Sequence, residues 1–179
     1  SPVVSTYLCF REGFFTEVLI DAIVPLVKRW RRIGLVIVGT GDGLQVFQEQ
    51  LRSRQLDEHV LTGYDLGHDD FMTLMSRSDV HLRTPVTDGV SSTVLEALSM
   101  NIPVVASDNG NRPAHVVTNK AEDPCDLAEK LEQTLRNHDQ ISAAITPPSI
   151  ADTVDAEVNR LMLGTTGSSF SELPEQARD

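Results

Sequence analysis

The sequence predicts an α/β domain with a parallel, doubly wound sheet. Short runs rich in valine and isoleucine alternate with longer segments in which apolar residues recur every three or four positions, and no internal repeat is present. The first pattern is typical of buried strands, and the second is typical of helices that cover a sheet. Strands and helices in this alternation form a parallel sheet covered on both faces, which binds ligands at the carboxyl ends of its strands.

The expected elements follow one another with short turns between them. We expect strands at residues 3–10, 35–38, 59–62, 80–82, 102–106 and 115–118. We expect helices at residues 14–30 with a kink at Pro25, at 44–54, after an N-cap at Asp69 or Asp70, from about Ser91, after the N-cap Asp123, and at 150–162. The turn Gly39-Thr40-Gly41-Asp42-Gly43 matches a dinucleotide fingerprint only weakly, because Leu44 stands at the third glycine and no acidic residue ends the next strand.

Length and composition favour one globular domain. A chain of 179 residues with 40% hydrophobic residues can bury a substantial core, and we expect a domain at residues 1–163 followed by a polar tail at 164–179. The formal charge of −11 argues against nucleic acid or an anionic membrane as the main partner, because both bind basic surfaces. We expect a cytoplasmic protein without an integral membrane segment, since no apolar run approaches the roughly 20 residues that span a bilayer and no signal peptide is recognisable. The five histidines lack paired spacing, so no metal site is expected.

The segment 79–109 is the chemical centre of the chain, and it predicts a strand, a loop, a helix and a second strand. The consecutive residues Gly89, Val90, Ser91, Ser92 and Thr93 place backbone N–H groups and hydroxyls at the helix start. A helix N-terminus attracts anions, phosphate above all. Glu96 lies about one turn later and leans back toward the same point, while Asp88 precedes the turn. A phosphorylated polyol fits this arrangement; the alternative is that the serines only cap the helix and Glu96 is solvated.

Residues 87–107, TDGVSSTVLEALSMNIPVVAS, resemble the signature of retaining, nucleotide-sugar-dependent glycosyltransferases of the GT-B fold, specifically family 4 and its relatives. The signature consists of an acidic residue, seven residues and then Glu-Ala, followed by a Pro-Val-Val strand. The first acid is usually Glu in the family and is Asp88 here.

The resemblance implies the Rossmann-like, donor-binding C-terminal half of a GT-B enzyme that transfers a hexosyl group from a nucleotide-diphosphate sugar with retention. It implies catalytic roles for Asp88, facing the donor sugar, and for Glu96, binding the ribose hydroxyls. The amides of residues 89–93 would hold the diphosphate, and neither a metal nor a cofactor would be needed.

The resemblance also extends to residues that precede this signature. It implies that Gly39 and Gly41 line the cleft and that Tyr64 belongs to the segment after Gly63 that contacts the nucleotide base, although Tyr64 is equally an ordinary half-buried aromatic residue. The family's basic pair is altered, because Tyr7 and Glu12 stand where Arg and Lys are usual. Arg11 is a candidate for the basic role, with Arg83 or Arg112 as a helper; alternatively, Arg11 is a solvated rim residue.

The acceptor half of such an enzyme is an N-terminal domain that this sequence lacks. We therefore expect a domain that binds donor and does not turn over alone. Two alternatives remain: a non-catalytic nucleotide-sugar-binding or interaction module with a degenerate site, and a GT-B-fold nucleotide-sugar epimerase.

Overall fold

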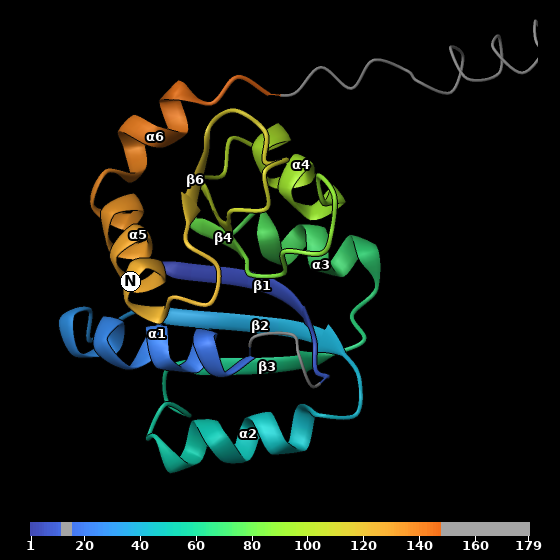
Figure 1. The fold of residues 1–179 in the computed structure, drawn as a ribbon, viewed down its shortest axis with the longest axis vertical. Helices are drawn as coiled ribbons and strands as arrows, with labels where there is room; N and C mark the ends of the chain where they lie inside the picture. The colour runs from blue at the N-terminus through green and yellow to red at the C-terminus, as the bar shows by residue number, and fades with distance from the viewer. Residues whose placement is uncertain (12–15, 148–179) are drawn as a thin grey trace, which may run out of the picture. The chain divides into compact units, whose positions relative to one another are not determined.

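A sheet of six parallel strands forms the centre of the molecule (Figure 1). The computed structural model of the chain describes residues 1–11 and 16–147. The strands are β1 (Val3–Cys9), β2 (Gly34–Thr40), β3 (Val60–Tyr64), β4 (Val80–Arg83), β5 (Val104–Ser107) and β6 (Val116–Asn119). The helices are α1 (Thr16–Arg29), α2 (Leu44–Ser53), α3 (His68–Met75), α4 (Ser92–Ser99), α5 (Pro124–Arg136) and α6 (His138–Ala144).

The strand order β3-β2-β1-β4-β5-β6 places the first strand in the middle of the sheet. All five pairings are parallel. The chain moves outward from β1 through β2 to β3, and then returns to the other side of β1 to form β4. Such a reversal leaves a crevice between the carboxyl ends of the two central strands, where doubly wound folds bind ligands. The predicted Rossmann-like, doubly wound fold is therefore confirmed.

Apolar side chains fill the space on both faces of the sheet. On β5, Val105 belongs to a core cluster with residues of α1, α2 and α5, whereas Val104 and Ala106 belong to a second cluster with residues of α3 and α4. This alternation follows from the two-residue period of a strand. The sheet thus separates two helical layers, as expected for strands that are apolar on both sides.

The start of one helix differs from the sequence prediction, and one further helix was not predicted. The N-cap of α3 is Gly67 and has no side-chain cap, so the predicted caps Asp69 and Asp70 are wrong. Both carboxylates lie in the first turn of α3, where they interact favourably with the helix dipole. Helix α6 was not predicted, because it buries none of its residues and therefore carries no apolar period. The predicted cap Asp123 is confirmed, since its carboxylate accepts from two amides of the first turn of α5.

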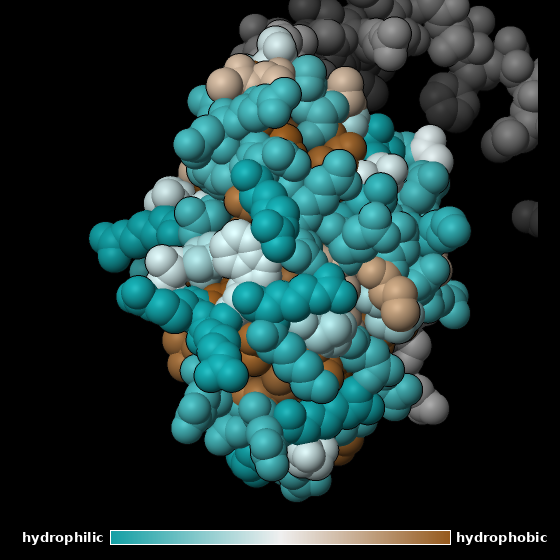
Figure 2. Space-filling view, turned by 90° about the vertical axis from the view of Figure 1, so that its left-hand side faces the viewer, coloured by the Kyte–Doolittle hydropathy of each residue, from teal (hydrophilic) through white to brown (hydrophobic). Residues whose placement is uncertain are grey.

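The predicted helix 150–162 and the tail 164–179 lie outside the described residues, so the domain boundary at 163 stays a prediction. Within the described part of the chain, no helix is both long and apolar enough to cross a membrane. Figure 2 looks at the left-hand side of Figure 1, which carries the N-terminus; hydrophilic residues cover most of this face, and apolar side chains show only in small areas between them.

Candidate functional site

A pocket of about 380 Å³ opens at the crevice between the carboxyl ends of β1 and β4. Its lining comes from the ends of both strands, from the start of α3 and from the first turns of α4: Tyr7, Leu66, His68, Phe71, Arg83, Ser91, Ser92, Thr93 and Glu96. A larger hollow of about 460 Å³ lies between His115 and the facing residues of α5 and α6. His115 precedes β6, so that hollow is at the amino edge of the sheet, away from the crevice. We therefore take the pocket beside α4 as the candidate site.

The first turn of α4 offers uncapped backbone donors to the pocket. Ser91 occupies the N-cap position, but its side chain makes no capping hydrogen bond. Its hydroxyl lies 3.2 Å from Thr93 Oγ1 instead. Ser91 has a φ of 65°, a conformation that costs a non-glycine residue on the order of 1 kcal/mol. The alternative that Ser91 only caps the helix is therefore wrong, and the first N–H groups of α4 have no side-chain acceptor from the N-cap.

A buried histidine on β4, His81, lies within hydrogen-bonding distance of Thr93 at the start of α4. His81 Nε2 lies 3.2 Å from Thr93 Oγ1, and His81 Nδ1 lies 3.4 Å from the hydroxyl of the buried Ser5 on β1. Burial, and to a smaller extent the positive charge of Arg83, lower the pKa of His81 to about 3. The imidazole is therefore neutral near pH 7 and links the sheet to the helix start. Sequence reasoning missed His81; the signal was a single polar residue inside the apolar strand Val80–Leu82.

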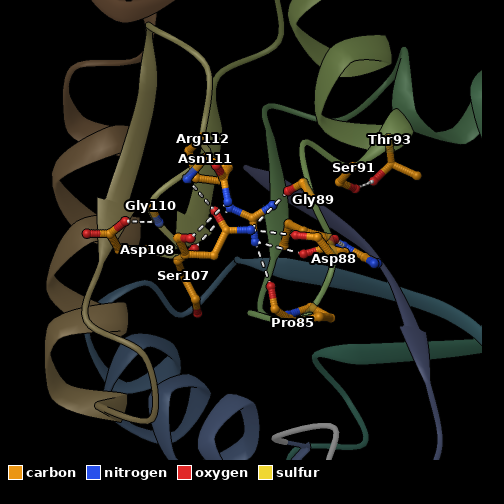
Figure 3. Close-up of polar contacts among 12 residues, drawn as sticks. Pro85, Asp88, Gly89, Ser91, Thr93, Ser107, Asp108, Gly110, Asn111 and Arg112 are labelled. Carbon is orange, nitrogen blue, oxygen red and sulfur yellow. Dashed lines mark hydrogen bonds and ion pairs between the residues drawn. The ribbon is translucent and has the colours of Figure 1, made fainter.

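Asp88 lies between Arg83 and Arg112, and Figure 3 shows Asp88 beside Arg112. Arg83 Nε donates to Asp88 Oδ2 at 2.7 Å, and Arg112 Nη2 donates to Asp88 Oδ1 at 3.2 Å. Both carboxylate oxygens are thus engaged by guanidinium groups, and Asp88 is not among the residues that line the pocket. Arg83 does line it, so this cluster presents an arginine to the pocket in place of the carboxylate.

Glu96 is the acidic residue that lines the pocket. It lies on α4, and its side chain is 25% exposed. Its Oε1 is 3.9 Å from Nε2 of His68, which belongs to the first turn of α3. The carboxylate therefore stands about one helical turn from the α4 amides, as the spacing in the sequence predicts.

The remaining predicted residues do not line the pocket. Gly89 and Val90 are on the exposed loop before α4. Tyr64, at the end of β3, is 57% exposed. Arg11 is exposed and lines a separate hollow with Phe10 and Phe47.

The two predicted cleft glycines serve the packing of the turn after β2. A Cβ on Gly39 would lie 2.2 Å from the carbonyl oxygen of Leu8. Gly41 has a φ of 114°, and a Cβ there would lie 2.8 Å from the carbonyl oxygen of Phe10. Both positions therefore require glycine, because the backbone at the end of β1 and just after it approaches closely, whatever their role toward a ligand.

The pocket thus combines one guanidinium group, hydroxyls and the first amides of α4 with one carboxylate, that of Glu96. The first set suits an oxyanion such as phosphate, and the carboxylate suits hydroxyl groups that donate to it. Within residues 1–11 and 16–147, no group of three or more histidine, cysteine, aspartate or glutamate residues is placed to hold a metal ion.

Comparisons with known proteins identify a family and structures with the same fold. A family model described as glycosyl transferases group 1 matches residues 13–137, more than half of the chain. A glycosyltransferase from Rickettsia africae superposes with a TM-score of 0.76 and 14% identity, over 93% of this chain and 48% of its own. HepE from Anabaena, solved with UDP-glucose, gives a TM-score of 0.71 and 17% identity, over 93% of this chain and 49% of its own.

A third structure is a single domain. The C-terminal domain of a glycosyl transferase group 1 family protein, LpcC from Francisella tularensis, superposes with a TM-score of 0.69 and 15% identity, over 80% of each chain. This chain spans about half the length of the Rickettsia and Anabaena proteins. No curated protein matches the sequence significantly.

Proposed function

Because this chain belongs to the glycosyl transferases group 1 family, we propose that it is the nucleotide-sugar-binding domain of a retaining, family 4-like glycosyltransferase. The observation that carries the proposal is the pocket at the β1–β4 crevice, where the N-terminus of α4, Arg83 and Glu96 meet. The donor is a nucleotide-diphosphate sugar, and the transferred group is a hexosyl unit. The Anabaena neighbour, solved with UDP and with UDP-glucose, supports a nucleotide sugar as ligand.

Each part of the donor has a matching part of the pocket. The diphosphate lies at the first turn of α4, because backbone N–H groups and the helix dipole favour negative charge there. The ribose hydroxyls donate to Glu96, one turn further along the helix. The leaving diphosphate is stabilised by these donors and by a basic side chain, so the reaction needs no metal.

The domain acts as part of a longer enzyme in our proposal. The crevice between this domain and an acceptor-binding domain would hold the acceptor, and that second domain would bind it. The chain alone therefore binds donor without measurable transfer, and we propose the cytoplasm as its place of action.

A non-catalytic nucleotide-sugar-binding module is the second candidate. The observation that favours it is Tyr7, which stands where the family has a basic residue. Its ring packs edge-on against that of Phe71 in the pocket wall, with 5.4 Å between the ring centroids. A tyrosine supplies no positive charge at this position.

Titration calorimetry with UDP-, GDP- and ADP-sugars tests the proposal. Wild-type chain should bind at least one of them, and Glu96→Ala should weaken that binding by about 1–3 kcal/mol, because a hydrogen bond to a charged group is lost. Glu49→Ala, an exposed carboxylate on α2, is the matched control and should leave the affinity unchanged. Wild-type silence toward all three donors contradicts the proposed function, and an unaltered affinity of Glu96→Ala contradicts the role of Glu96.

A further inference from the structure

We propose that Arg83 is the cationic residue that binds the diphosphate of the donor, and that Asp88 positions Arg83 instead of contacting the sugar. This inference rests on the proposed function, because it assigns residues of the same pocket. It replaces the role expected for Asp88 from the family resemblance, and it gives the basic role to Arg83 in place of Arg11.

Two fixed hydrogen bonds set the orientation of Arg83. It is the last residue of β4, beside the end of β1, and its Nη1 donates to the carbonyl oxygen of Tyr7 at 2.8 Å. Its Nε donates to Asp88 Oδ2 at 2.7 Å. A guanidinium group is planar and has five N–H donors, so these two bonds fix its plane and leave three donors. Among the residues that the structure describes, no acceptor engages Nη2, and the side chain is 16% exposed where it lines the pocket.

Asp88 is held in place on the side away from the pocket. Arg112, whose side chain is only 2% exposed, donates through Nη2 to Asp88 Oδ1 and to the carbonyl oxygen of Pro85 at 2.6 Å. Its Nε donates to the carbonyl oxygen of Ser107 at 3.0 Å. The side-chain amide of Asn109 donates to the carbonyl oxygens of Asp88 and Gly89. The loop after β5 therefore clamps the loop that carries Asp88, as Figure 3 shows.

The charges favour this division of roles. Asp88 neutralises one of the two adjacent guanidinium charges, so the cluster keeps one net positive charge. Arg83 is the only lysine or arginine among the nine described residues that line the pocket. The chain as a whole carries a formal charge of −11, so an anionic ligand gains its attraction from this local charge and from the α4 amides. Paired N–H donors of arginine match phosphate oxygens in geometry as well as in charge.

The first test compares nucleotides with and without the diphosphate. We would titrate UDP, GDP and ADP, each beside its nucleoside, into wild-type chain, Arg83→Gln, Arg83→Lys and the exposed control Arg52→Gln. Arg83→Gln should lose at least about tenfold in affinity for the diphosphate, since a charge-assisted hydrogen bond is removed, and less than about twofold for the nucleoside. Arg83→Lys keeps the charge but not the paired donors, so a smaller loss is expected; this variant also serves if the glutamine variant does not fold.

The second test separates positioning from sugar contact at Asp88. Asp88→Asn should weaken the binding of the nucleoside diphosphate and of the corresponding nucleotide sugar by the same factor. In the Arg83→Gln background, Asp88→Asn should reduce the affinity little further. A loss confined to the nucleotide sugar, or full additivity in the double variant, overturns the positioning role. Equal affinity of wild type and Arg83→Gln for the diphosphate overturns the role of Arg83 alone, whereas wild-type silence toward every nucleotide overturns the proposed function and this inference together.

Discussion

Replacing His81 should remove much of the pH dependence of folding stability between pH 7.5 and pH 5. In the folded chain, burial first and the charge of Arg83 second lower the pKa of His81 from 6.5 to about 3. The unfolded chain therefore binds a proton at His81 in a range where the folded chain does not. Stability must then fall as the pH is lowered from the unfolded pKa of about 6.5 toward the folded pKa of about 3.

The size of the effect follows from the two pKa values. One pKa unit corresponds to about 1.4 kcal/mol, so the full contribution approaches about 5 kcal/mol at very low pH. At pH 5 the unfolded histidine is almost fully protonated and the folded one is neutral, which corresponds to about 2 kcal/mol relative to pH 7.5. The carboxylates titrate mainly below this window, so the histidine dominates the comparison.

Urea unfolding at both pH values, followed by the fluorescence of the single tryptophan, measures this effect. Trp30 packs against the core cluster, so it reports loss of the folded state. His81→Gln should show a pH dependence smaller than that of wild type by about 2 kcal/mol. His68→Gln, at a side chain that is 68% exposed, should behave like wild type. A pH dependence that survives in His81→Gln would refute the reasoning, as would an imidazole of His81 that titrates above pH 5 by NMR.

Two further substitutions test how the site is built. Gly39→Ala should destabilise the chain strongly or prevent folding, because the added Cβ would lie 2.2 Å from the carbonyl oxygen of Leu8. Gly34→Ala on the same strand is the control and should be tolerated, because a Cβ there meets no atom within 4 Å. Thermal melting of the two variants measures the difference in stability. Asp123→Ala should lower the free energy of unfolding by about 1 kcal/mol, because two amides of α5 lose their acceptor. The neighbouring Glu122 is a poor control position, because its φ of 60° makes any substitution there affect the backbone as well. Asp139→Ala, at a fully exposed side chain, is the better control, and an equal effect there would contradict the cap.

Near the site, the sequence predicts the placement of residues whose neighbours are local in the chain. Ser91 is the N-cap of α4, and Thr93 and Glu96 lie within this short helix, so their spacing alone places them within about one and a half turns of one another. Asp123 caps its helix through amides two and three residues later, which the sequence also shows. The N-cap of α3 was misplaced because glycine and aspartate both suit a helix start, and only the backbone path chose Gly67.

The sequence by itself determined the α/β class, the parallel sheet and the place where α4 starts, because alternating strands and helices and a helix terminus are encoded over a few residues at a time. Only the tertiary structure decided which charges meet there. Arg83 reaches a carbonyl 76 positions away, and Arg112 reaches Asp88 across 24 positions. These contacts depend on β1 lying beside β4 and on the loop after β5 packing against the loop after β4. Periodicity carries no information about such pairs, since the order of strands in the sheet sets them.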